Sequence, residues 1–226
     1  MALQTFGDER MLAYCAFCGG STGTRDHCPS RVFLDSPFPD DLPVVPACSE
    51  CNGSFSADEQ YLACLVSCVL AGSADPDAIR RPSIRKTLEH SAKLRARIEK
   101  ARSIDGEQIV FAAEQDRVNS VITKLAQGHA LYELHEPRPT KPDVVWAVPL
   151  ALLSETDVLS FERPGTPEIW PEVGSRAMQR LIVGQEPDLP WIVVQPGMYR
   201  YLASPGSGTT VHIVIQEYLA GYVHWE

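Results

Sequence analysis

Apolar side chains recur with helical spacing through the middle of the chain. They predict helices over 57–71, 84–102 and 114–134. Ser56 and Glu59 have the spacing of a capping box ahead of the first helix, and Gly72 is the expected residue just beyond its end. The apolar faces of the other two helices comprise Ile84, Leu88, Leu94 and Ile98, and Val118, Val121, Ile122 and Leu125.

Short apolar, β-branched and aromatic runs predict strands before and after these helices. The expected strands are 42–47, 143–148, 191–194, 198–202, 210–216 and 218–225, with a hairpin loop at 204–208 and a further helix at 171–183. The pattern predicts an α+β protein whose C-terminal strands are antiparallel. We divide it into an N-terminal region 1–75, a helical region 76–136 and a C-terminal α+β region 137–226.

The composition is that of a soluble globular protein, with 44% hydrophobic and 22% charged residues in a chain of 226. The longest apolar run, 61–72, is too short to span a bilayer, so no membrane association is expected. The first nine residues lack the basic and apolar segments of a secretory signal, which predicts a cytoplasmic location. Seven cysteines, an odd number, argue against a disulfide scaffold.

The net charge of −9 argues at first against a nucleic-acid partner. The charge is unevenly distributed, however. Residues 1–79 carry three basic and eleven acidic side chains (−8), residues 80–102 carry nine and two (+7), and residues 103–226 carry eight and sixteen (−8). Lys86, His90, Lys93, Arg97 and Lys100 fall on one side of the predicted helix 84–102. This stripe is either a solvated face or a contact surface for a DNA backbone.

Four of the cysteines form two Cys-x-x-Cys pairs. Cys15 and Cys18 make the first pair, and Cys48 and Cys51 make the second. Two such pairs supply four thiolates to one tetrahedral Zn²⁺, so we predict a structural zinc ion. This ion would close a loop that contains Asp26 and His27.

The order Cys-x-x-Cys, Asp26-His27-x-Pro, Cys-x-x-Cys-Asn52 resembles the zinc-stabilised HNH endonucleases, a family with a ββα-metal fold. The resemblance covers about residues 15–61. It implies a zinc-stapled ββα-metal module in which His27 ends the first strand and acts as general base on a water. It also implies that Asp26 and Asn52 hold a catalytic Mg²⁺ or Mn²⁺ ion. The expected activity is metal-dependent hydrolysis of phosphodiester bonds, with DNA as the expected substrate, in a chain that can also form homo-oligomers.

The chain departs from the family at one position. Its two asparagines are Asn52 and Asn119, so the middle Asn that buttresses the base in the family has no counterpart, and Asp40 or Asp41 is the nearest substitute. This departure and the acidic N-terminal region favour an alternative, a zinc-stapled module that binds nucleic acid or protein without cleaving it.

Several other polar residues have a functional and a structural interpretation. Arg31 is a candidate phosphate contact, together with Lys86, Lys93 and Arg97, but an ion pair with Asp26 or Asp35 is the alternative for Arg31. The three remaining cysteines and three of the other histidines are expected to be structural. They are Cys28, Cys64 and Cys68, and His129, His212 and His224.

Overall fold

The computed structural model describes residues 13–163, 167, 169–184 and 189–226. The N-terminal residues on which the prediction of no secretory signal rests lie outside this part of the chain. The elements of the N-terminal region are β1 (Thr24–His27), a 3₁₀ turn η1 (Arg31–Phe33), β2 (Val44–Ala47), α2 (Ser49–Ser54) and α3 (Ser56–Ala71). β1 and β2 form an antiparallel ribbon in which Thr24 is opposite Ala47 and His27 is opposite Val44.

The middle of the chain consists of helices and a small hairpin. Its elements are η2 (Pro76–Ala78), α4 (Pro82–His90), α5 (Ala92–Lys100), β3 (Arg102–Asp105), β4 (Gln108–Phe111) and α6 (Gln115–His129), which continues as a π-helical turn η3 (Ala130–Leu134). The predicted single helix 84–102 is therefore wrong. Ser91 adopts φ −112° and ψ 77°, which ends α4, and Arg102 already belongs to β3.

The C-terminal region contains a five-stranded antiparallel sheet. Its elements are β5 (Val144–Pro149), η4 (Leu150–Leu152), α7 (Glu155–Glu162), α8 (Arg176–Gly184), β6 (Ile192–Gln195), β7 (Tyr199–Pro205), β8 (Thr209–Ile215) and β9 (Leu219–Trp225). The strand order is β5-β9-β8-β7-β6, and every neighbouring pair is antiparallel. The α+β prediction is confirmed, and the predicted strands of this region are all present.

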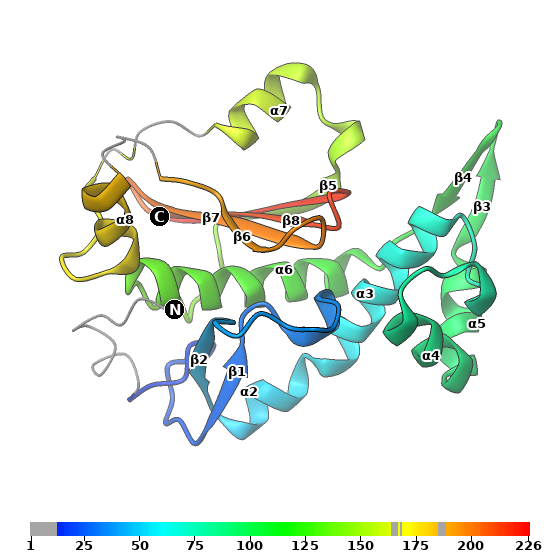
Figure 1. Cartoon of the computed structure of the whole chain (residues 1–226), viewed down its shortest axis with the longest axis horizontal. Helices are drawn as coiled ribbons and strands as arrows, with labels where there is room; N and C mark the ends of the chain where they lie inside the picture. The colour runs from blue at the N-terminus through cyan, green and yellow to red at the C-terminus, as the bar shows by residue number, and fades with distance from the viewer. Residues whose placement is uncertain (1–12, 164–166, 168, 185–188) are drawn as a thin grey trace.

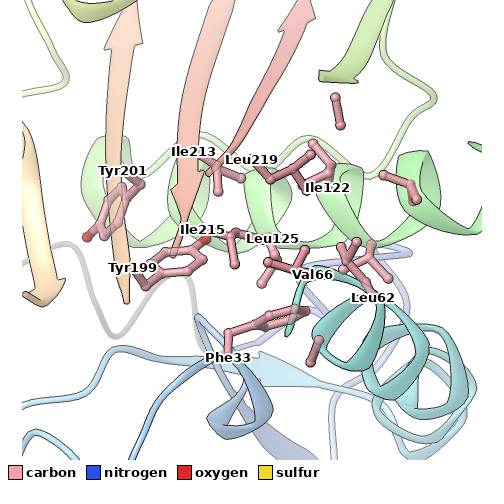
Figure 2. Close-up of a cluster of buried hydrophobic side chains, with 14 of the residues drawn as sticks. Phe33, Leu62, Val66, Ile122, Leu125, Tyr199, Tyr201, Ile213, Ile215 and Leu219 are labelled. Carbon is pink, nitrogen blue, oxygen red and sulfur yellow. The ribbon is translucent and has the colours of Figure 1, made fainter. Parts of the chain in front are cut away.

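Helix α6 lies between the C-terminal sheet and the N-terminal elements, while α7 covers part of the opposite face of the sheet (Figure 1). Alternation along β8 explains this layering, since Val211, Ile213 and Ile215 join the core with α6 while His212 and Val214 point to the other face. Figure 2 shows Phe33 and Leu62 gathered with Leu125 of α6 and with Tyr199 and Ile215 of the sheet.

The main hydrophobic core draws on all three predicted regions of the chain. Phe33 and Leu62 come from the first region, Ile122 from the second, and Tyr199 and Ile213 from the third, and all five are almost completely buried. The division of the chain into regions remains a prediction. Among the described residues, no helix combines the length and the apolar character needed to cross a membrane.

The sequence predicted the C-terminal end of helix α3 correctly but not its N-terminal cap. Gly72 follows the helix with φ +65°, and its amide bonds back to the carbonyls of Cys68 and Val69, as predicted. The predicted capping box is wrong, because Ser56 is the first helical residue and Phe55 takes the N-cap position. Glu59 instead points into the protein interior and is 7% exposed.

Candidate metal centre and active site

The four cysteines of the two Cys-x-x-Cys pairs come together at one end of the β1–β2 ribbon. Cys15 and Cys18 lie in a tight turn, in which the Cys15 amide donates to the Gly20 carbonyl and the Gly19 amide donates back to Cys15. Cys48 follows β2 directly and caps α2, where its sulfur accepts a hydrogen bond from the Cys51 amide. The four sulfur atoms all lie within 4.8 Å of one another.

This cluster is compatible with a structural metal ion such as zinc. A tetrahedral ion with sulfur ligands at about 2.3 Å separates the sulfurs by about 3.8 Å. The sulfurs of Cys18 and Cys48 are 3.9 Å apart. Burial raises the pKa of the Cys15 thiol, but backbone hydrogen bonds at Cys48, Phe17 and Cys18 outweigh it and lower that pKa to about 7. The donor set and its spacing therefore fit zinc.

His27 lies at the other end of the ribbon, as the last residue of β1. A backbone hydrogen bond from the Cys28 amide to the Pro43 carbonyl joins the residue after β1 to the residue before β2 at this end. The Nδ1 atom of His27 is buried. Burial and the nearby charge of Arg31 lower the pKa of His27, while Asp26 and the Pro43 carbonyl oppose this shift. The side chain is therefore a neutral imidazole at neutral pH, the form that accepts a proton.

Asp26 points to the opposite side of β1, toward α6. Its Oδ2 atom lies 2.6 Å from the ammonium nitrogen of Lys124. Lys124 also bonds to Glu59 and to the Ser30 hydroxyl, which itself donates to Glu59. The Lys124 side chain is only 2% exposed and the Asp26 side chain 12%. A buried ammonium group therefore neutralises part of the negative charge around Asp26.

Lys124 was not predicted as a site residue, and Glu59 was predicted as part of a capping box. The sequence contains no local signal for their pairing, because the two residues are 65 positions apart.

Asn52 joins α2 to β1. Its amide nitrogen donates to the Thr24 hydroxyl and to the Arg25 carbonyl, at 3.2 Å in both cases. The Asn52 Oδ1 and Asp26 Oδ1 oxygens have no hydrogen-bond partner among the residues that the structure describes. These are hard oxygen donors of the kind that Mg²⁺ and Mn²⁺ accept. The oxygens are of the right chemical type for such an ion, but Lys124 already shares the charge of Asp26, and no contact among the described residues joins Asn52 to Asp26.

The predicted substrate contacts lie apart from one another in the fold. Arg31 is exposed and lies over the Phe38 ring, and in the described part of the chain it pairs with neither Asp26 nor Asp35. Lys86 is on α4, whereas Lys93 and Arg97 are on α5, so the basic stripe does not follow one helix. Arg97 makes an ion pair with Glu114 at 2.5 Å.

The three cysteines outside the cluster and His129 are buried, as expected for structural residues. Cys64 and Cys68 are fully buried in the core. Cys28 is packed against α6, where its thiol donates to the Leu125 carbonyl and contacts His129. His129 is also fully buried, and its ring stacks on Tyr201.

Comparisons of the chain with models of protein families, with curated proteins and with solved structures found no match. The functional interpretation therefore depends on the residues and their geometry.

Proposed function

We propose that the chain is a zinc-stapled HNH-type endonuclease that hydrolyses phosphodiester bonds, with DNA as its substrate. The observation that carries the proposal is the order of elements around one ribbon. β1 ends in His27, β2 leads directly into α2, Asn52 on α2 bonds back to β1, and the four cysteines lie at the far end. This is the arrangement that the family resemblance implies.

His27 acts as the general base in this proposal. Its pKa is lowered, so the imidazole stays unprotonated at neutral pH and can take a proton from the attacking water. Nδ1 of His27 has no hydrogen-bond partner among the described residues, Asp40 and Asp41 included, so the support that the family draws from its middle Asn has no counterpart there. Asp26 and Asn52 would hold a divalent ion, which when bound supplies positive charge for the phosphate. Arg31, Lys86 and Lys93 are exposed and would supply phosphate contacts, which Arg97 could join only by leaving its ion pair with Glu114.

A second candidate is a zinc-stapled module that binds nucleic acid without cutting it. The ion pair between Lys124 and Asp26 favours this candidate, because an ammonium group close to a carboxylate weakens its attraction for a second cation. The two candidates differ in whether His27 acts on a substrate.

A nicking assay separates the two candidates. Supercoiled plasmid is incubated with the zinc-loaded protein and Mg²⁺ or Mn²⁺. A parallel reaction contains single-stranded RNA in place of the plasmid, as an alternative substrate. For the nuclease, His27→Ala should lower the rate at least about 100-fold, the usual effect of losing a general base. His224→Ala is the matched control, since His224 lies on the face of the C-terminal sheet that is turned away from the β1–β2 ribbon. Equal, slow nicking by wild type and His27→Ala, both folded and zinc-loaded, would support the non-catalytic module.

A further inference from the structure

An aromatic cavity lies on the face of the C-terminal sheet that is turned away from α6. It has a volume of about 310 Å³, and α7 forms its other wall. This is at the lower end of the roughly 300–1,000 Å³ typical of small-molecule sites. The lining residues are Trp146, Leu153, Asp157, Ser160, Phe161, His212 and Tyr222.

The register of the sheet explains why these rings meet. Trp146 on β5 is opposite Tyr222 on β9, and Tyr222 is opposite His212 on β8, so all three side chains point to the same face. The Trp146 and Tyr222 rings are nearly parallel, at 10° and 5.3 Å between centroids. Phe161 of α7 completes the aromatic wall at 5.8 Å from Trp146 and 4.9 Å from His212.

The polar groups of this aromatic cavity suit an uncharged ligand with its own donors and acceptors. His212 Nδ1 is 2.9 Å from the Phe161 carbonyl, which only accepts, so Nδ1 carries the proton and Nε2 is an acceptor. Within the described part of the chain, Nε2 and the hydroxyls of Ser160 and Tyr222 have no hydrogen-bond partner. A planar ring with N–H and carbonyl groups would satisfy these atoms while stacking on the aromatic wall.

The charge of the aromatic cavity excludes an anionic ligand. The lining set contains no lysine or arginine, and Asp157 is its one ionisable carboxyl group. The Asp157 carboxylate accepts a hydrogen bond from Ser154 at 2.6 Å. A neighbouring cavity of about 270 Å³ shares Ser160, His212 and Tyr222 and adds Thr210 and His224, so a ligand with a sugar attached to its ring has room to extend.

We propose that this cavity binds an uncharged nucleobase, as a free base or nucleoside, through stacking on Trp146 and a hydrogen bond to His212 Nε2. This site goes beyond the proposed nuclease function, since it lies on the opposite side of the sheet from α6 and the β1–β2 ribbon. It assigns a ligand-binding role to the C-terminal region.

Isothermal titration calorimetry and ligand-detected NMR on the full-length protein test whether the aromatic cavity binds a nucleoside. The probes are adenosine, guanosine, cytidine and thymidine, each paired with its 5′-monophosphate, and a short single-stranded oligonucleotide. We expect saturable binding of at least one nucleoside, and weaker binding of its monophosphate and of the oligonucleotide, because no cation lines the cavity.

Two variants locate the binding. Trp146→Leu removes the stacking partner, and Ser160→Trp fills the cavity from an exposed position on α7, so each should weaken binding at least tenfold. Leu159→Ala is the control, because Leu159 is 61% exposed on α7 and does not line the cavity. The proposal is overturned by the absence of saturable nucleoside binding, by tighter binding of the monophosphate or oligonucleotide, or by unchanged affinity in Ser160→Trp. Nucleosides contain no phosphodiester bond, so a failure here is separate from a failure of the nuclease proposal.

Discussion

The ammonium nitrogen of Lys124 lies 2.6 Å from Oδ2 of Asp26, inside the protein and 98 positions away in the sequence. This contact joins α6 to β1 next to the candidate base. Phe17 and Phe55 surround the same ammonium group, with ring centroids at 5.4 and 5.6 Å. The pair therefore connects the charge around the candidate active site with the packing of Phe17 in the Cys15–Cys18 turn.

Replacing Lys124 should destabilise the protein strongly. Lys124→Met leaves Asp26 and Glu59 buried without their counter-charge, and breaking a buried pair in this way typically costs about 3–5 kcal/mol. Chemical denaturation at neutral pH measures the change in the free energy of unfolding. Lys141→Met, at an exposed lysine, should change this free energy by less than about 0.5 kcal/mol. Similar values for the two variants would contradict a structural role for the Lys124 pair.

Metal content gives a direct measurement of the four-cysteine cluster. Elemental analysis should find about one Zn²⁺ per chain in the wild type. Cys48→Ser should lose most of this zinc, because the sulfur that caps α2 is removed, whereas Cys64→Ala should retain it, because Cys64 is buried in the core away from the cluster. Full zinc content in Cys48→Ser would exclude the four-thiolate site.

The pH dependence of nicking should reflect the environment of His27. Burial lowers the pKa of this imidazole below its usual 6.5, so the unprotonated base persists at more acidic pH. The nicking rate should therefore reach half of its maximum at a pH below 6.5. A rate profile between pH 5 and 8 checks this expectation, and a half-maximal rate above pH 6.5 would argue against His27 as the base.

His212 should make the folded protein sensitive to acid. Burial lowers its pKa to about 4, so between pH 6.5 and 4 the unfolded chain takes up a proton that the folded chain does not. Its contribution to stability is fully present above pH 6.5 and falls by about 3 kcal/mol by pH 4. Unfolding measured across this range should show a shallower dependence for His212→Gln than for wild type. His90→Gln should keep the wild-type slope, because His90 is exposed.

Gly128 is required by the close approach of Cys28 to α6. A Cβ atom at position 128 would lie 2.5 Å from the Cys28 sulfur. Alanine usually stabilises a helix relative to glycine by about 1 kcal/mol, but overpacking at this site should reverse the sign and destabilise by about 1–3 kcal/mol. Adding Cys28→Ala should recover part of the loss, because the sulfur is removed. A double-mutant cycle of melting temperatures tests this coupling.

The periodic elements of the fold were predictable from sequence because each has a strong local signal. The helical face around Val118 and Val121 and the β-branched run of β8 gave their elements directly. The helix break at Ser91 was not predictable, because α4 and α5 together keep one apolar periodicity through Ile84 and Ile98. The β3–β4 hairpin and α7 were also missed. β3 and β4 have no buried residue and Phe161 is the one buried residue of α7, so the apolar pattern of each element is weak.

The candidate site was predictable only where its residues belong to recognisable local motifs. The cysteine spacing correctly indicated a cluster of four sulfurs. The partner of Asp26 lies on α6, and no local pattern connects the two positions. The same reason applies to His212. Its place between Phe161 and Tyr222 depends on the covering helix α7 and on cross-strand register, so its sequence neighbours gave it only a structural interpretation.

Helix α6 and its π-helical extension have a consequence for the order of events during biosynthesis. Leu131 packs in the same cluster as Cys15 and Phe17, and Cys28 contacts His129 across 101 positions. The ribosome therefore releases the four thiols of the four-cysteine cluster before it completes the part of α6 and η3 against which they pack. Metal capture by the nascent chain would protect these thiols from oxidation during that interval.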